Sequence, residues 1–392
     1  MLGNWSVWTC LDVNWQTDHS RDDSTAMGKL FQSWLVHIQN DCERRAAHNT
    51  PPRGNGGIGS NFAWLMRDFL TALEVGRVYR PSESWRWADT IQSDTCSLHI
   101  ASYDCFFEPL SHCMYSDFKP FTTEEIDTAV NALKFEDDNR DVCSIGRALK
   151  KSIQFVHAQF LAYILRPNES LRKQIDSAVS YVFDESTENK STICVHIRGG
   201  HPDNSRVAGN IDRYMSQIDE IVNSSYQRTG KQVGMVYFAS DLIHQNAISS
   251  EFMQERFPRP FSYKVLPHIL DEHLEDGETE LFLNWQEDSE GLEHTSKLGI
   301  SRRNITTEFL IDINLLSKCD YFIGSVSSVY FLVAGLRIAS NDVAYNSTCY
   351  IETHTEDQPM VCEGSAKSRR FWQGMSMGYD SEESSFIEIL ST

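Results

Sequence analysis

Three short groups of polar residues, each at the end of an apolar segment, could together bind a phosphorylated substrate. They are His196-Ile197-Arg198, Ser240-Asp241 and Ser325-Val326-Ser327-Ser328. An arginine at a strand end can donate two parallel hydrogen bonds to a phosphate. A serine-rich turn that opens a helix adds hydroxyls and unpaired backbone N–H groups, which favour anions. We therefore expect a diphosphate site in which Arg198 is the main cation.

Each group also has a purely structural explanation. Arg198 could be an ion-pair partner, and the serines could only cap a helix. For one segment alone the two explanations are evenly matched, and three such groups on successive strand ends favour the binding site.

The charge of the chain limits its partners. With 35 Lys and Arg against 55 Asp and Glu, the formal net charge is −20. Nucleic acid and anionic membrane surfaces repel such a chain, so neither is an expected partner. A phosphorylated ligand would have to be held by a small, local set of basic groups.

The elements that would position the polar groups alternate between strands and helices. Short apolar runs predict strands at 193–197, 233–239, 263–266 and 321–324, and periodic patterns predict helices at 211–228, at 304–318 and after Ser328. This alternation predicts an α/β fold with a doubly wound parallel sheet, which binds ligands at the carboxyl ends of its strands. The three polar groups fall there.

The first half of the chain has a different pattern. Helices are predicted at 26–46, at 61–75 and twice within 120–165, with a short strand at 77–79. The polar stretch 184–191 predicts a linker. Because 392 residues exceed one ordinary core, we expect domains at 1–185 and 191–365, with a tail at 366–392 that packs back on the first.

The ten cysteines contain no C-x-x-C pair, so a zinc ribbon is not expected. Their even number and scattered spacing suit disulfides. Cys349 and Cys362 flank a polar segment and predict a local structural disulfide, whereas Cys194 and Cys319 lie in apolar runs and are the candidates for free thiols.

Six N-x-S/T sequons also point to a secretory-pathway glycoprotein. They begin at Asn4, Asn168, Asn189, Asn223, Asn304 and Asn346. The chain has no run of about 20 apolar residues and no secretory signal at Met1. We therefore expect either that a membrane anchor was removed or that the protein is delivered without one.

Three segments resemble the α1,6-fucosyltransferases and the rhizobial Nod-factor fucosyltransferases. Residues 193–214 (ICVHIRGGHPDNSRVAGNIDRY) resemble their H-x-R segment, and residues 309–336 (FLIDINLLSKCDYFIGSVSSVYFLVAGL) resemble their L-D-I-x-F-L-S, D-F/Y-L-V and T-F-S-S motifs. Gly57-Ile58-Gly59-Ser60, followed by a helix and then Trp85-Arg86-Trp87-Ala88, resembles their glycine-rich turn and W-R-Y-A. The resemblance covers roughly residues 55–115 and 190–340.

The resemblance implies a GT-B-like fold of two Rossmann-like domains, with GDP-fucose bound mainly by the second. It implies an inverting transferase, without metal or cofactor, that acts on an oligosaccharide or glycoprotein acceptor, and the Golgi lumen as its location. By position, His196 and Asp312 would recognise guanine and Arg198 would bind the β-phosphate.

The other matched positions would complete the donor site. Ser327 and Ser328 would hold phosphate oxygens, and Ser325 belongs to the same donor-binding turn. The resemblance places Trp87 near the donor, and Gly57 and Gly59 would let backbone N–H groups approach it.

Asp312 has an independent signal in the sequence. It interrupts an otherwise apolar run, Phe309 to Leu316. A carboxylate in such a run is expected to be buried with a hydrogen-bonding partner rather than solvated.

The chain departs from the family after its H-x-R. Gly199 stands where the family commonly has a basic residue, and His201 replaces an aspartate. Asp203 is the nearest carboxylate in this loop and is our candidate general base. Asp241, which matches a family aspartate, is the alternative. No SH3-like domain follows, which counts against a core α1,6 linkage to N-glycans, and both the N-glycan core and another oligosaccharide stay open as acceptors.

Two other functions remain open. A protein O-fucosyltransferase would share the H-x-R segment, and a glycan-binding protein that has lost catalysis would suit Gly199 and His201. Arg198 and Asp312 favour an enzyme, because the resemblance assigns them to the donor. A metal-dependent transferase would need a D-x-D at a strand end, and the nearest approach, Glu136-Asp137-Asp138, lies in a polar stretch.

Overall fold

The structure is a computed structural model of the 392-residue chain. It describes residues 24–42, 47–49, 58–74, 77–81, 103–113, 153–183, 189–197, 211–240, 248–266, 302–325, 327–340, 347–351 and 361–363.

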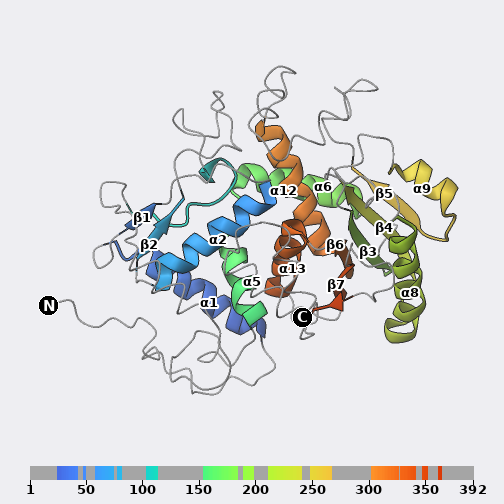
Figure 1. Ribbon diagram of the computed structural model, residues 1–392, viewed down its shortest axis with the longest axis horizontal. Helices are drawn as coiled ribbons and strands as arrows, with labels where there is room; N and C mark the ends of the chain where they lie inside the picture. The colour runs from blue at the N-terminus through green and yellow to red at the C-terminus, as the bar shows by residue number, and fades with distance from the viewer. Residues whose placement is uncertain are drawn as a thin grey trace, which may run out of the picture.

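A six-stranded sheet organises the second half of the chain (Figure 1). Its spatial order is β5 (Ser262–Val265), β4 (Val233–Ser240), β3 (Ser191–Ile197), β6 (Tyr321–Ser325), β7 (Thr348–Ile351) and β8 (Val361–Cys362). The first five strands are parallel, and β8 is antiparallel to β7. The predicted parallel sheet is confirmed, and each of its four predicted strands begins and ends within two residues of the prediction.

Helices cover both faces of this sheet, as in a doubly wound fold. The helices α8 (Ile211–Thr229) and α9 (Ser250–Arg256) pack with Val195, Phe238 and Ile323 on one face. The helices α12 (Arg302–Lys318) and α13 (Ser328–Ser340) pack with Cys194, Tyr237 and Phe322 on the other. The two sets of strand residues differ because successive side chains point to opposite faces.

The strand order reverses between β3 and β6. From β3 the chain moves outward through β4 and β5, and it then returns to add β6 and β7 on the other side of β3. The crevice at such a reversal is where doubly wound sheets bind ligands. The carboxyl ends of β3 and β6 are therefore where a site should lie.

Helices from the first half of the chain pack against α12 and α13. The described elements there are α1 (Ser24–Gln39), β1 (Ala47–Asn49), α2 (Ile58–Glu74), β2 (Val78–Arg80), the 3-10 turn η1 (Tyr103–Cys105), α5 (Ile153–Ile164) and α6 (Glu169–Val182). The strands β1 and β2 form a separate parallel pair.

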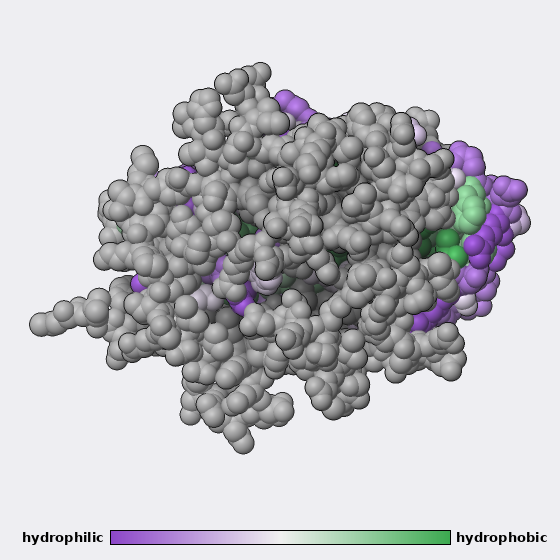
Figure 2. Space-filling view, turned by 45° about the horizontal axis from the view of Figure 1, so that its top comes forward, coloured by the Kyte–Doolittle hydropathy of each residue, from purple (hydrophilic) through white to green (hydrophobic). Residues whose placement is uncertain are grey.

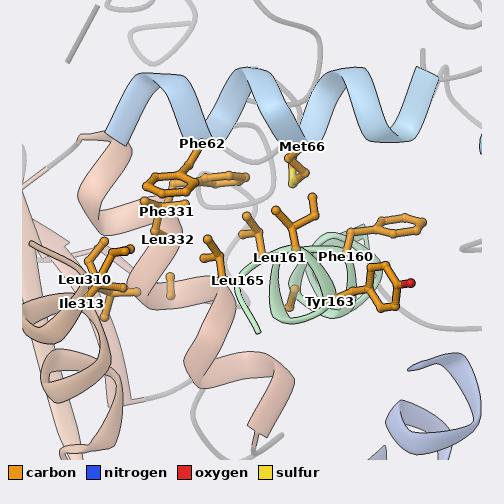
Figure 3. Close-up of a cluster of buried hydrophobic side chains, with 14 of the residues drawn as sticks. Phe62, Met66, Phe160, Leu161, Tyr163, Leu165, Leu310, Ile313, Phe331 and Leu332 are labelled. Atoms are coloured by element: carbon orange, nitrogen blue, oxygen red, sulfur yellow. The ribbon is translucent and has the colours of Figure 1, made fainter. Parts of the chain in front are cut away.

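One hydrophobic core joins α2 and α5 to α12 and α13 (Figure 3). Phe62 of α2 lies beside Phe331 of α13, and Leu161 of α5 lies beneath α2 in the same cluster. Gly335 allows α13 to approach α5, because a Cβ there would collide with Leu161. Helices on both sides of the expected linker thus share a core, and the division into domains at 1–185 and 191–365 stays a prediction.

The helix predicted at 26–46 is wrong at its carboxyl end. The helix α1 ends at Gln39, where the Asn40 side chain donates to the Val36 carbonyl at 2.8 Å. This bond satisfies a carbonyl that the helix would otherwise leave open, and it stops the helix before residue 41. The helix α2 begins at Ile58, so Gly59 lies inside its first turn. Residues 114–152, 267–301 and 364–392 lie outside the described residues, as do the predictions made for them, which include the tail at 366–392.

Three disulfides are described, and they settle two predictions. Cys349–Cys362 joins β7 to β8, which confirms the local disulfide. Cys194–Cys319 joins β3 to the end of α12, so the expectation of free thiols is wrong. Buried thiols and buried disulfides share the same apolar sequence context, and only the fold shows that these two sulfurs meet. Cys42–Cys113 is the third.

The outer surface over α8 and α9 is mostly hydrophilic, with a small hydrophobic patch (Figure 2). Among the helices that the structure describes, none combines the length and hydrophobicity that crossing a membrane requires.

Arg337 of α13 is a buried cation that ties together the loops at the amino ends of β6 and β7. Its side chain is 3% exposed. It donates to the carbonyls of Cys319 and Asp320, to both oxygens of Ser347, and to Thr348 Oγ1 at 2.7 Å. Burial lowers its pKa to about 10, so the guanidinium stays charged at neutral pH.

Arg337→Met is expected to lower the free energy of unfolding by about 3 kcal/mol, because buried carbonyls would lose a charged donor. Urea unfolding followed by circular dichroism measures the change. Arg337→Lys is the matched control: it keeps the charge but cannot span the same acceptors, so an intermediate loss is expected. A loss below about 1 kcal/mol for Arg337→Met would mean that water replaces the donor.

Candidate functional site

The carboxyl ends of three neighbouring strands bring the predicted residues to one edge of the sheet. The ladder pairs His196 of β3 with Ala239 of β4 and Gly324 of β6. It also pairs Ile197 with Ser240. The described parts of the three polar groups therefore lie at the same edge of the sheet, and that they form one site stays a prediction. Arg198, Asp203, Asp241, Gly57 and Trp87 lie outside the described residues.

His196 lies on the face of the sheet that α12 and α13 cover. It is two residues beyond Cys194, and side chains two apart share a face. Cys194 pairs across the ladder with Tyr237, so His196 and Tyr237 are diagonal neighbours on that face. His196 is 8% exposed, which leaves it only a narrow opening to solvent.

Asp312 of α12 lies over the same face. The Tyr237 hydroxyl donates to Asp312 Oδ1 at 2.6 Å, and Asp312 is 8% exposed. Burial and then the Asp312 charge raise the pKa of Tyr237 well above its usual value, so the phenol keeps its proton and can donate. The prediction that Asp312 is buried with a hydrogen-bonding partner is confirmed. The two residues assigned to guanine, His196 and Asp312, thus belong to one layer.

Ser325 faces the other way. It is 1% exposed and lies two residues beyond Ile323, whose side chain packs with α8. It lies close to Tyr214 of α8, and burial raises the pKa of that phenol to about 12. The side chains of Ser325 and Asp312 are therefore on opposite faces of the sheet, and a donor-binding role for Ser325 stays a prediction.

Ser327 caps α13. Its Oγ accepts from the backbone N–H of Tyr330 at 3.2 Å, which is the geometry of an N-cap. The structural explanation for this serine therefore holds. It orients the first turn of α13, whose N–H groups point toward the end of β6. Ser328, the first residue of the helix, is half-buried.

The first turns of α2 and α13 are in contact. A Cβ on Gly59 would lie 3.0 Å from Ser328 Cβ and 3.5 Å from the Val329 nitrogen, so only glycine allows this approach without a shift. A helix N-terminus carries about half a positive charge. Neither helix has an acidic residue in its first turn. Two positive helix ends therefore meet beside the end of β6, which favours an anion there.

Aromatic rings hold α2 against α12 next to this point. The rings of Phe62 and Phe309 are parallel within 1°, with centroids 6.4 Å apart. Phe309 is one turn before Asp312, and Phe62 is one turn after Gly59. This contact fixes the glycine-bearing turn relative to the helix that carries Asp312. Among the described residues, no group of three or more His, Cys, Asp or Glu side chains is placed to hold a metal ion.

Sequence reasoning missed Tyr237 and Tyr214. Tyr237 lies in an apolar strand segment and Tyr214 in a helix of mixed polarity, and both are fully buried. For Tyr237 the available signal was a tyrosine within a buried strand, since a buried tyrosine hydroxyl needs a partner. The partner of Tyr237, Asp312, is 75 positions away in the chain and could not be identified from spacing.

Comparison with known proteins finds no matching protein family and no matching curated protein. Similar solved structures include NodZ α-1,6-fucosyltransferase soaked with GDP-fucose, at 15% identity and a TM-score of 0.44, covering 81% of this chain and 99% of that one. The NodZ structure from Bradyrhizobium gives 15% and 0.42, with the same coverage. A variant of Arabidopsis thaliana FUT1 in complex with GDP gives 14% and 0.39, covering 79% and 72%. Similarity at this level does not establish membership of a family.

Proposed function

We propose that the chain is an inverting fucosyltransferase that uses GDP-fucose without a metal ion. The observation that carries the proposal is the contact between the first turns of α2 and α13 at the reversal of strand order. The chain has a net charge of −20, but neither of these helices has an acidic residue in its first turn. Together the two helix N-termini form a locally positive region that suits a diphosphate. The H-x-R segment supplies Arg198 directly after β3.

The choice of guanine rests on Asp312 and His196. A carboxylate accepts two parallel hydrogen bonds, and the guanine edge offers N1–H and the 2-amino group in that arrangement. Uracil and cytosine do not present this pair of donors. Asp312 is held by Tyr237 on the face that His196 shares, so we assign both residues to one base.

In the proposed reaction an acceptor hydroxyl attacks C1 of fucose from the side opposite GDP. The new C1–O bond forms as the bond from C1 to the β-phosphate oxygen breaks, and GDP leaves with both electrons. Asp203, or alternatively Asp241, takes the acceptor proton. Arg198 and the helix N-termini stabilise the charge that builds on the β-phosphate.

The proposed acceptor is an oligosaccharide or a glycoprotein, bound on the side of residues 1–185, while residues 191–365 bind the donor. The three disulfides suit an oxidising compartment. We place the enzyme in the secretory pathway, with the Golgi lumen as its proposed location.

A donor screen tests the proposal. GDP-, UDP- and CDP-sugars are compared for donor hydrolysis and for the rise in melting temperature that each nucleotide causes. GDP-fucose should be hydrolysed, and GDP should stabilise the protein far more than UDP or CDP. Stabilisation by GDP without any turnover of GDP-fucose would contradict transfer, and equal effects of the three nucleotides would contradict the base assignment.

Activity is expected to survive EDTA, because arginine and helix N-termini take over the neutralising role of a divalent ion. The rate of fucose transfer is measured before and after dialysis against EDTA, with Mn²⁺ added back to a parallel sample. Complete loss with recovery in Mn²⁺ would show that the diphosphate is held by a metal.

A further inference from the structure

We propose that Tyr237 is a positioning residue that fixes the orientation of the Asp312 carboxylate toward the nucleotide base, and so determines selectivity for guanine. This inference rests on the proposed function. It starts from the 2.6 Å hydrogen bond between the Tyr237 hydroxyl and Asp312 Oδ1. That length lies in the range of O–H···O⁻ bonds to a charged acceptor, which are stronger than neutral ones.

The bond restricts the carboxylate. An aspartate on a helix can turn its terminal carboxyl group, because the last side-chain torsion is soft. A strong hydrogen bond to one named oxygen removes that freedom before the nucleotide arrives. Tyr237 itself cannot move, because it is fully buried on a central strand and packs in the core beneath α12.

The hydroxyl is suited to this role and not to proton transfer. Burial and the charge of Asp312 keep the phenol protonated, so it acts as a constant donor. A carboxylate has about four lone-pair positions, and the phenol uses one of them. The proposed function requires Asp312 to accept as well from N1–H and from the 2-amino group of guanine. The site is thus prepared for a base with two adjacent donors.

Tyr237→Phe removes one oxygen atom and leaves the ring. The base is remote from the bond that breaks, so binding changes while the chemical step does not. We expect KM for GDP-fucose to rise about tenfold with kcat nearly unchanged, which is the effect of losing a hydrogen bond to a charged group. The preference for GDP over inosine diphosphate, which lacks the 2-amino group, should fall by a similar factor.

Tyr330→Phe is the matched control. The Tyr330 hydroxyl donates to Glu363 Oε1, also at 2.6 Å and between fully buried side chains. The control removes the same atom from the same type of bond, elsewhere in the same core. Both variants should lose comparable stability, whereas only Tyr237→Phe should lose selectivity for GDP over inosine diphosphate.

Asp312→Asn tests the idea in a protein that keeps the Tyr237 hydroxyl. In this variant the Tyr237 hydroxyl would donate to the amide oxygen of the asparagine. The amide Nδ2 would then take the place of the second carboxylate oxygen, facing the base. Preference should then move from GDP to xanthosine diphosphate, which carries an oxygen in place of the 2-amino group. This variant decides the question even if Tyr237→Phe fails to fold.

Binding constants for GDP, inosine diphosphate and xanthosine diphosphate are measured by calorimetry on all four proteins. Unchanged GDP selectivity in folded Tyr237→Phe would overturn the role of Tyr237 while leaving the proposed function intact. Unchanged preference for GDP in Asp312→Asn would contradict the assignment of Asp312 to guanine, and the role of Tyr237 with it. A wild type that binds GDP and inosine diphosphate equally would also overturn it. A wild type that neither binds GDP nor uses GDP-fucose would instead overturn the proposed function.

Discussion

Arg198→Ala should reduce the rate of transfer from GDP-fucose by about 10²–10³-fold, a loss of roughly 3–4 kcal/mol in transition-state stabilisation. Arg198 follows directly after Ile197, the last residue of β3, at the reversal of strand order. Negative charge on the β-phosphate grows as the bond to the sugar breaks, so the contact is stronger in the transition state than with the bound donor. The loss should therefore be mostly in kcat.

Arg198→Lys separates charge from geometry. Lysine keeps the positive charge but lacks the planar fork that binds two phosphate oxygens at once, so it should restore little of the rate. Melting curves establish that both variants fold. If folded Arg198→Ala keeps more than about a tenth of the wild-type rate, less than 1.4 kcal/mol is lost. Arg198 would then be structural, and the donor would bind elsewhere.

Asp203→Asn is expected to lower kcat by about 10²–10⁴-fold with donor affinity nearly unchanged, because a general base acts on the acceptor proton and not on GDP. The substitution removes the basic oxygen while keeping the size of the side chain. Initial rates at saturating donor and acceptor give kcat, and calorimetry with GDP gives the affinity.

Asp241→Asn is the matched comparison, because Asp241 is the alternative base and follows directly after Ser240, the last residue of β4. The variant with the larger fall in kcat identifies the base. A wild-type rate in Asp203→Asn removes Asp203 from the mechanism. Wild-type rates in both variants would mean that neither carboxylate takes the acceptor proton.

The order of strands and helices in the second half of the chain could be predicted from the sequence because each signal is local. A buried parallel strand is a short apolar run, and a helix repeats every 3.6 residues, so β3, β4, β5 and β6 fall close to their predicted positions. The polar groups at the strand ends could be recognised in the same way, because each of them directly follows an apolar run. The burial of Asp312 was also predictable, since a charge in an apolar run must find a partner.

Local patterns were less informative where the chain leaves regular structure. The end of α1 at Gln39 coincides with the hydrogen bond from the Asn40 side chain to the Val36 carbonyl, which the sequence did not predict. The strands β7 and β8 are too short to show a period, and β8 is antiparallel, held beside β7 by the Cys349–Cys362 disulfide.

What the sequence alone determined is therefore the α/β class, the strand ends that carry His196 and Ser240, and the need of Asp312 for a partner. Only the tertiary structure decided which residues meet: Tyr237 with Asp312, Cys194 with Cys319, and Gly59 with Ser328. Alternation along a strand assigns side chains to two faces but does not say which helix covers each face, so Ser325 turned out to face α8. Contacts between residues far apart in the chain depend on strand order and helix packing, and no local pattern encodes either.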